Sequence, residues 1–142
     1  MRIWSELLDE MVSGNRGRAS HALLMNLPRI HGWERGRVWC DFEVDQRFIQ
    51  PQGNLFGGYV AALADEFLGI VAMTVVPNHA PFGNTDLHTN FLRPVRGGRL
   101  SVEARVIHEG RRNILAEAEF RDSENALAVK ASATFVVQPV PK

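Results

Sequence analysis

A long apolar stretch from Leu55 to Val76 constrains the fold of this chain more than any other feature. After Gly57-Gly58 its large side chains recur at helical spacing, and Pro77 follows it, so the stretch predicts one long helix. A helix that is apolar on nearly every side has to be covered by other elements. We therefore expect a central helix around which the remainder of the chain wraps.

Asp65 and Glu66 are the only charged residues in this stretch. Burial of an unpaired carboxylate is unfavourable, so a carboxylate in such a place is expected to shift its pKa or to serve a function. Successive helical positions point about 100° apart, so the two acids face different surroundings. Glu66 is expected to face a partner charge or the exposed edge of the helix. Asp65 is the better candidate for a working acid, because only small residues share its face and leave room for a ligand: Ala61, Gly69 and Ala72.

The same stretch is long enough to span a bilayer, which takes about 20 apolar residues. Two acids at its centre oppose insertion, each by about 2.5 to 3.5 kcal/mol. We expect the helix to lie inside a soluble protein that has no membrane partner.

Beyond the helix the apolar residues alternate, which is typical of strands. The alternation predicts strands over residues 85–92, 100–108, 113–120 and 127–137, and an earlier hairpin from residues 27–33 and 37–44. Short turns between the later strands predict a meander of four successive antiparallel strands. Residues 4–11 have helical spacing and predict a short amphipathic helix. The expected class is α+β, one domain over 1–142 with an N-terminal helix and loop (1–26) and a core (27–137).

The composition excludes several classes of function. Sixteen Lys and Arg residues balance sixteen Asp and Glu residues, so no attraction to nucleic acid is expected. Cys40 is the only cysteine, and the five histidines lack metal-ligand spacing, so neither a disulfide nor a metal site is expected. The first residues lack the apolar core of a signal peptide, and we expect a cytoplasmic protein.

A turn-rich segment, Gln50 to Asn54, leads into the glycine pair at the start of the expected helix. Glycines at a helix entrance let a ligand approach backbone N–H groups, and the helix dipole there favours negative charge. Such a donor suits a developing oxyanion, to which it contributes about 2.7 to 4 kcal/mol in a transition state. The alternative is structural, because Gly57-Gly58 would also provide a tight turn and close packing of the helix on the sheet.

The segment from Gln50 to Gly58, followed by Leu63-Ala64-Asp65, resembles the start of the central helix in the hotdog-fold thioesterases. Within them it is similar to the PaaI-like acyl-CoA thioesterases of the phenylacetic acid pathway, which have N-x-x-G-x-x-H-G-G and then L-A-D. The resemblance covers residues 27–137 and implies a hotdog fold, in which an antiparallel sheet wraps around a long central helix. Further landmarks follow in family order: Phe91-Leu92-Arg93-Pro94, Gly98-Arg99-Leu100, Gly110-Arg111 and Ala131 to Phe135.

The resemblance implies an acyl-CoA thioesterase that needs no cofactor beyond the CoA of its substrate. Asp65 takes the place of the catalytic acid, either as a general base on water or as a nucleophile on the thioester. The N–H of Gly57 takes the place of the oxyanion donor, with Gln50 and Gly58 beside it. The resemblance also implies that Arg93, Arg111 and Arg112 lie near the CoA phosphates. Asn84 lies near the family position that can help to hold the water.

Two positions depart from the family pattern. Gln50 replaces the usual asparagine, which keeps an amide but shifts the group that it holds by about a bond length. Phe56 replaces the usual histidine, and either lines an acyl pocket or signals that hydrolysis has been lost. A non-catalytic acyl-CoA or acyl-carrier-protein binding module is therefore the alternative function. A hotdog dehydratase is disfavoured, because no histidine lies between His31 and His79.

Helix geometry adds a requirement for a second copy of the chain. Gly57 and Asp65 are eight positions apart, which is about 12 Å along a helix axis. An acid and an oxyanion donor must each come within about 3 Å of one reacting centre, so the two cannot act together within one chain. A facing subunit with its helix antiparallel would supply the missing half. This predicts a two-fold homodimer, and the resemblance implies a dimer or a dimer of dimers.

Overall fold

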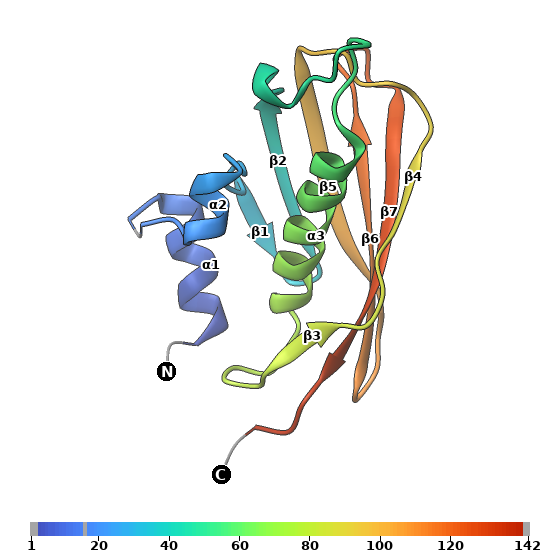
Figure 1. Ribbon diagram of the computed structural model, residues 1–142. Helices are drawn as coiled ribbons and strands as arrows, with labels where there is room; N and C mark the ends of the chain where they lie inside the picture. The colour runs from blue at the N-terminus through green and yellow to red at the C-terminus, as the bar shows by residue number, and fades with distance from the viewer. Residues whose placement is uncertain (1–2, 16, 141–142) are drawn as a thin grey trace.

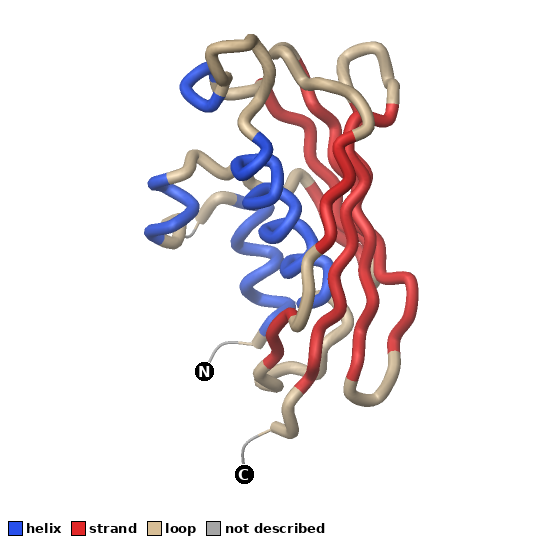
Figure 2. Tube along the Cα trace, turned by 45° about the vertical axis from the view of Figure 1, so that its right-hand side comes forward, coloured by secondary structure: helices blue, strands red, loops and turns tan. Residues whose placement is uncertain are grey.

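The computed structural model describes residues 3–15 and 17–140. In this part of the chain, seven strands form one antiparallel sheet that packs against a long helix, α3 (Gly57–Met73). Figure 1 shows α3 on the concave side of the sheet, and α1 (Trp4–Ser13) and α2 (Ser20–Leu24) on the far side of α3. The second view shows the same separation of strands from helices (Figure 2). The expected central helix is therefore covered by a curved sheet on one side and by short helices on another.

The strands in chain order are β1 (Gly32–Glu34), β2 (Arg37–Glu43), β3 (Phe82–Asn84), β4 (His88–Phe91), β5 (Arg99–Glu109), β6 (Asn113–Arg121) and β7 (Leu127–Val137). Across the described sheet they are ordered β1-β2-β5-β6-β7-β3, and β4 also pairs with β7. Bulges in the pairs β5–β6 and β6–β7 increase the local twist and help the sheet to curve around α3. A 3-10 turn, η1 (Gln46–Phe48), follows β2 and leads toward α3.

Alanines form the part of the sheet on which α3 lies. Ala104, Ala118 and Ala131 are register partners across β5, β6 and β7, and Ala116 pairs with Ala133 in a second row. All five are buried. Because these side chains are short, the helix backbone can approach the strands closely while its own large side chains fill the remaining space.

The opposite face of the sheet is polar. Lys130 lies 3.0 Å from Glu119 and 3.2 Å from Glu117, and Arg37 lies 3.0 Å from Glu103. The strands thus alternate between charged residues that face solvent and apolar residues that face α3. No helix in the described residues is long and apolar enough to cross a bilayer.

The structure corrects several expected elements in the first half of the chain. Only Gly32 and Trp33 of the strand expected over residues 27–33 are in a strand, β1, because Pro28 has no N–H and the N–H of Leu27 bonds back to Ala22. Helix α3 ends at Met73, a few residues before the proline that was expected to end it. The short elements α2 and η1 were not predicted, since so few residues show no clear periodicity.

The strand expected over residues 85–92 is also different. Only His88–Phe91 of it is a strand, β4, and β3 precedes the expected span. The carboxylate of Asp86 accepts the N–H of Thr134 and interrupts the backbone ladder between the two strands. The predicted four-stranded meander is wrong, since β4 pairs with β7 and only β5, β6 and β7 are successive neighbours. The reason is that β2 already occupies the other edge of β5.

Candidate active site

The loop before α3 is fixed by backbone hydrogen bonds. The N–H of Leu55 donates to the carbonyl of Val95 at 2.6 Å, and the N–H of Gln50 donates to the carbonyl of Asn54 at 2.8 Å. Gly53 closes this turn with a φ of 95°, in the left-handed region that favours glycine. The loop therefore determines where α3 begins and keeps Gln50 beside its first turn.

Gly57 and Gly58 open α3 with unused hydrogen-bond donors. Their N–H groups donate to no group in the described part of the chain, and the residue before them, Phe56, makes no side-chain cap. Unpaired N–H groups at a helix start attract negative charge, and the helix dipole adds to the attraction. The donors predicted for an oxyanion are thus available.

Two aromatic rings flank the glycine pair. A Cβ on Gly58 would lie 2.7 Å from the ring of Phe56, and a Cβ on Gly57 would lie 3.3 Å from the ring of Phe91. The two phenylalanines are 52% and 57% exposed. Glycine at both positions therefore lets the rings approach the start of the helix. Phe91 lines the candidate site, whereas from the sequence it was named only as part of a family landmark.

A cavity of about 320 Å³ adjoins this end of α3. It brings together three of the predicted site residues, Gln50, Gly57 and Arg93, and its wall includes Phe91 and Leu92. Arg93 forms no ion pair with any described residue, so its guanidinium is free to bind an anion.

Asp65 lies on the side of α3 that neither the sheet nor the short helices cover. It is exposed, and it makes no hydrogen bond or ion pair with the described residues. The expected burial of this acid is therefore wrong for a single chain, because the elements that cover α3 leave the side with Ala61 and Gly69 partly open. Ala72, which was expected on the same face, is fully buried.

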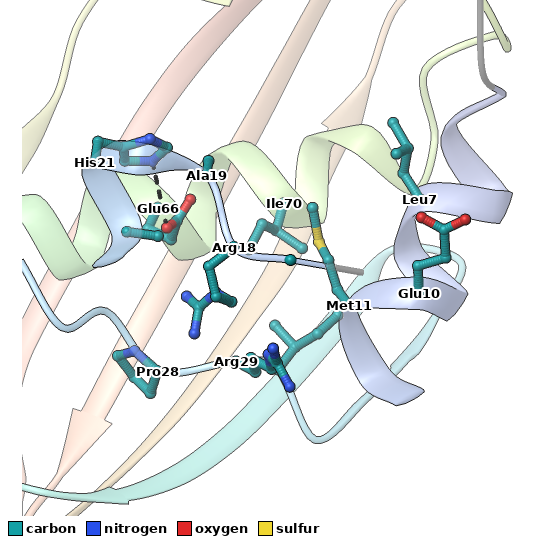
Figure 3. Close-up of a pocket in the computed structure, with 13 residues that line it drawn as sticks. Leu7, Glu10, Met11, Arg18, Ala19, His21, Pro28, Arg29, Glu66 and Ile70 are labelled. Atoms are coloured by element: carbon teal, nitrogen blue, oxygen red, sulfur yellow. Dashed lines mark ion pairs between the residues drawn. The ribbon is translucent and has the colours of Figure 1, made fainter. Parts of the chain in front are cut away.

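Glu66 faces α2, in keeping with the expectation that it faces a partner side chain. One of its carboxylate oxygens lies 3.6 Å from Nε2 of His21 (Figure 3). Its side chain is 18% exposed. Glu66 also lines a second cavity, of about 210 Å³, which α1, α2 and α3 enclose.

Three predicted residues lie at the other end of the sheet, namely Asn84, Arg111 and Arg112. The N–H of Arg93 bonds to Ala128 near the start of β7, whereas the N–H of Val137, its last residue, bonds to the carbonyl of Arg112. The length of β7 separates the two ends by about 30 Å. Within one chain these three residues therefore do not join Gln50 and Gly57.

Cys40 is not a second candidate nucleophile. It is buried in β2, and burial raises the pKa of its thiol to about 12. The thiol therefore stays protonated near neutral pH. In residues 3–15 and 17–140, no group of three or more His, Cys, Asp or Glu side chains lies together as a metal ion would require.

Comparison with known proteins places the chain in a family. Residues 52–129 match the model of the thioesterase superfamily. The chain is 31% identical over 110 residues to a protein of Saccharolobus solfataricus named as an esterase, and the overlap covers 77% of each. It is 27% identical over 106 residues to a 1,4-dihydroxy-2-naphthoyl-CoA hydrolase of Listeria monocytogenes, covering 74% of this chain and 85% of that protein.

Solved structures share the architecture. A thioesterase from Haemophilus influenzae superposes with a TM-score of 0.81 at 24% identity, covering 95% of this chain and 92% of the other. A Streptococcus mutans protein bound to acetyl-CoA gives a TM-score of 0.72 at 23% identity, covering 80% of this chain and 90% of the other. The expected hotdog fold is confirmed. Together with the family match, the curved sheet around α3 identifies this chain as a member of the thioesterase superfamily.

Proposed function

We propose that this protein hydrolyses an acyl-CoA thioester at sites shared by two subunits, each site using Asp65 of one subunit and Gly57 of the other. One observation carries the proposal: the unpaired carboxylate of Asp65 and the free N–H of Gly57 lie on the same helix, yet about 12 Å apart. Each chain thus holds both halves of a hydrolytic site but cannot bring them together. The name of the Listeria relative and the acetyl-CoA in the Streptococcus mutans structure agree with this substrate class.

The edge of the sheet beside α3 supports such pairing. In the described sheet β4 has only β7 as a strand neighbour, so its other edge is unpaired. Phe91 and Leu92, at the end of this strand, are 57% and 55% exposed. A two-fold axis at this edge would join the sheets of two subunits through β4 and set their α3 helices antiparallel. It would also cover the exposed apolar side chains and set Asp65 opposite the facing glycine pair.

In the proposed reaction, Asp65 removes a proton from water and the hydroxide attacks the carbonyl carbon of the thioester. The carbonyl oxygen becomes an oxyanion and accepts a hydrogen bond from the N–H of Gly57 in the facing subunit. Gln50 shares the cavity of Gly57 and would hold the carbonyl or the water through its amide. The C–S bond then breaks, and the CoA thiolate takes the proton from Asp65.

Direct attack by Asp65 on the carbonyl is the other route, through a mixed anhydride that water hydrolyses. In a single turnover in ¹⁸O-labelled water, the label enters Asp65 only by the second route, when water attacks the anhydride at the Asp65 carboxyl carbon. Label found in the Asp65 carboxylate by mass spectrometry would identify the nucleophilic route.

An antiparallel pair would also bring the basic residues together. Arg93 lies at the Gly57 end of each chain, whereas Arg111 and Arg112 lie at the opposite end. In an antiparallel pair, Arg111 and Arg112 of one subunit would lie near Arg93 of the other. The CoA phosphates would then meet cations from both subunits.

Mixed dimers test the shared site. Asp65→Asn and Gly57→Pro subunits, each expected to be inactive alone, are unfolded together and refolded as a mixture. Half of the dimers would be mixed, and each would keep one intact site, so thiol release should recover to about one quarter of the wild-type rate. No recovery would contradict a shared site.

Thiol release from short-chain, medium-chain and aryl acyl-CoAs tests hydrolysis itself. Release above background that depends on Asp65 is the expected result. Tight binding of these thioesters without turnover by the wild type would contradict hydrolysis. It would favour the binding module instead, which the exposed Phe56 in place of histidine would then explain.

A further inference from the structure

The cavity beside Glu66 is large enough for a ligand and has no part in the reaction described above. It lies between α1, α2 and α3 and measures about 210 Å³ (Figure 3). An apolar cavity of about 150 Å³ in another protein binds benzene, so this one can hold a ring or a short chain. Its wall is mainly apolar, with Leu7, Met11, Ala22, Pro28, Ile30 and Ile70.

The charged part of the wall has two guanidinium groups, of Arg18 and Arg29, and two carboxylates, of Glu10 and Glu66. Arg18 is half-buried, and its guanidinium donates to the carbonyl of Leu27 at 2.5 Å. Burial, followed by repulsion from Arg29, lowers the pKa of Arg18, although the nearby Glu66 offsets part of the shift. Both acids of the wall, Glu10 and Glu66, already have partners. The two guanidinium groups are thus close enough to repel each other, and they form no ion pair among the described residues.

Small residues on the surface of α3 connect Asp65 to this cavity. At about 100° per residue, Ala62 and Gly69 lie about 40° to 60° around the helix from Asp65. Glu66 and Ile70, which line the cavity, lie about 100° to 140° around in the same direction. A Cβ on Gly69 would have no atom within 4 Å. An acyl chain whose thioester lies at Asp65 can therefore pass over these small residues and end in the cavity.

We propose that this cavity receives the far end of the acyl group, and that Arg18 together with Arg29 selects acyl groups that end in a carboxylate. This inference rests on the proposed hydrolysis at Asp65. A terminal carboxylate would accept charge-assisted hydrogen bonds from the guanidinium groups and relieve their repulsion. An apolar end would instead cover two cations without giving them a partner. The substrate class is the CoA thioesters of dicarboxylic acids.

The test compares adipoyl-CoA with hexanoyl-CoA, whose chains have equal length and differ in the terminal carboxylate. The wild type is expected to have the higher kcat/KM for adipoyl-CoA. Arg18→Met should lower that value by about tenfold to a hundredfold and leave hexanoyl-CoA within about threefold. Arg18→Lys keeps the charge and should retain part of the preference. Arg121→Met, on the outer face of the sheet, is the matched control and should change neither value.

The opposite results would overturn the inference. They are a wild-type preference for hexanoyl-CoA, or an equal loss on both substrates in Arg18→Met. Circular dichroism and Tm verify that each variant is folded. If Arg18→Met does not fold, Arg18→Lys is used in its place.

A failure of hydrolysis can be told apart from a failure of this cavity assignment. If the wild type releases no thiol from either substrate, the proposed function fails, and calorimetry with free adipate and hexanoate then tests the cavity alone. Binding of adipate that is lost in Arg18→Met would support the carboxylate site. Equal binding of both acids, or of neither, would overturn it.

Discussion

The covered and open sides of α3 differ in what their residues contribute to the protein. On the covered side Leu63, Phe67 and Val71 have no exposed surface and pack against the sheet and the neighbouring elements. On the open side, Asp65 is exposed and unpaired in the described structure, next to the partly exposed Gly69. Packing explains the covered side completely, whereas it gives no reason for a carboxylate in the middle of an apolar helix. The residues of α3 that folding leaves unexplained are therefore those on which function is expected to depend.

Asp65→Asn and Glu66→Gln test this difference at adjacent positions and should give the largest effect. The first should lower kcat by about 10²- to 10⁴-fold, because the proposed catalytic carboxylate is lost. The second should stay within a few-fold of the wild type, because Glu66 faces His21 rather than the thioester. Both are measured by thiol release on the best substrate of the acyl-CoA panel, with Tm as the control for folding. Equal losses in the two variants would show that the sides of α3 are not divided in this way.

Gly57→Pro tests the N–H group at the start of α3. Proline suits the first position of a helix, and Phe56 already has the extended ψ of 125° that proline requires of the preceding residue. The variant removes the N–H and adds the proline ring, and loss of the N–H should reduce kcat by about 10²- to 10³-fold.

Gly57→Ala is the matched control, since it keeps the N–H and adds the Cβ that would press on Phe91. It should retain most of the activity that Gly57→Pro loses. If both variants are equally slow, crowding against Phe91 rather than the oxyanion donor is the cause.

Leu63→Ala tests the covered side. Leu63 is fully buried, and its truncation leaves a cavity next to the sheet, so the free energy of unfolding should fall by about 2 to 5 kcal/mol. Urea unfolding measures the change. The kcat of the fraction that remains folded should be close to that of the wild type, because Leu63 does not face the thioester. A large loss of kcat with little loss of stability would contradict the division between the sides.

The covered side could be predicted because packing leaves a periodic pattern in the sequence. The long helix and the strands β5, β6 and β7 follow from such patterns, and the glycine pair was recognised from its place before the helix. The exposure of Asp65 could not be predicted, because an apolar run does not say which of its sides the sheet leaves open. Phe91 reaches Gly57 only because β4 pairs with β7.

The second cavity was also beyond prediction from the sequence. It depends on α2, whose five residues are too few to show a period. Its charged wall joins Arg18, before α2, to Glu66, in the middle of α3. Contacts between residues so far apart in the chain depend on tertiary packing, which local patterns do not encode.

Tyr59 allows the smallest and most specific test, at the covered side of the first turn of α3. Its hydroxyl donates to the carbonyl of Asn26 at 3.1 Å, and its ring stacks on Phe48 at a centroid distance of 3.8 Å. Tyr59→Phe should lower the free energy of unfolding by about 1 kcal/mol near neutral pH, because this hydrogen bond is lost. Urea unfolding of the two proteins measures the difference.

The pH dependence of that difference has a defined direction. Burial raises the pKa of Tyr59 to about 12, above the value of about 10 expected in the unfolded chain. The folded protein thus keeps a proton that the unfolded chain loses, so the contribution of Tyr59 is complete below about pH 10 and is lost as the pH rises toward 12. The stability advantage of the wild type over Tyr59→Phe should therefore shrink when unfolding is repeated between about pH 10 and 11. An advantage that stays constant over this range would mean that the hydroxyl ionises equally easily in both states, and that this end of the covered side is open to water.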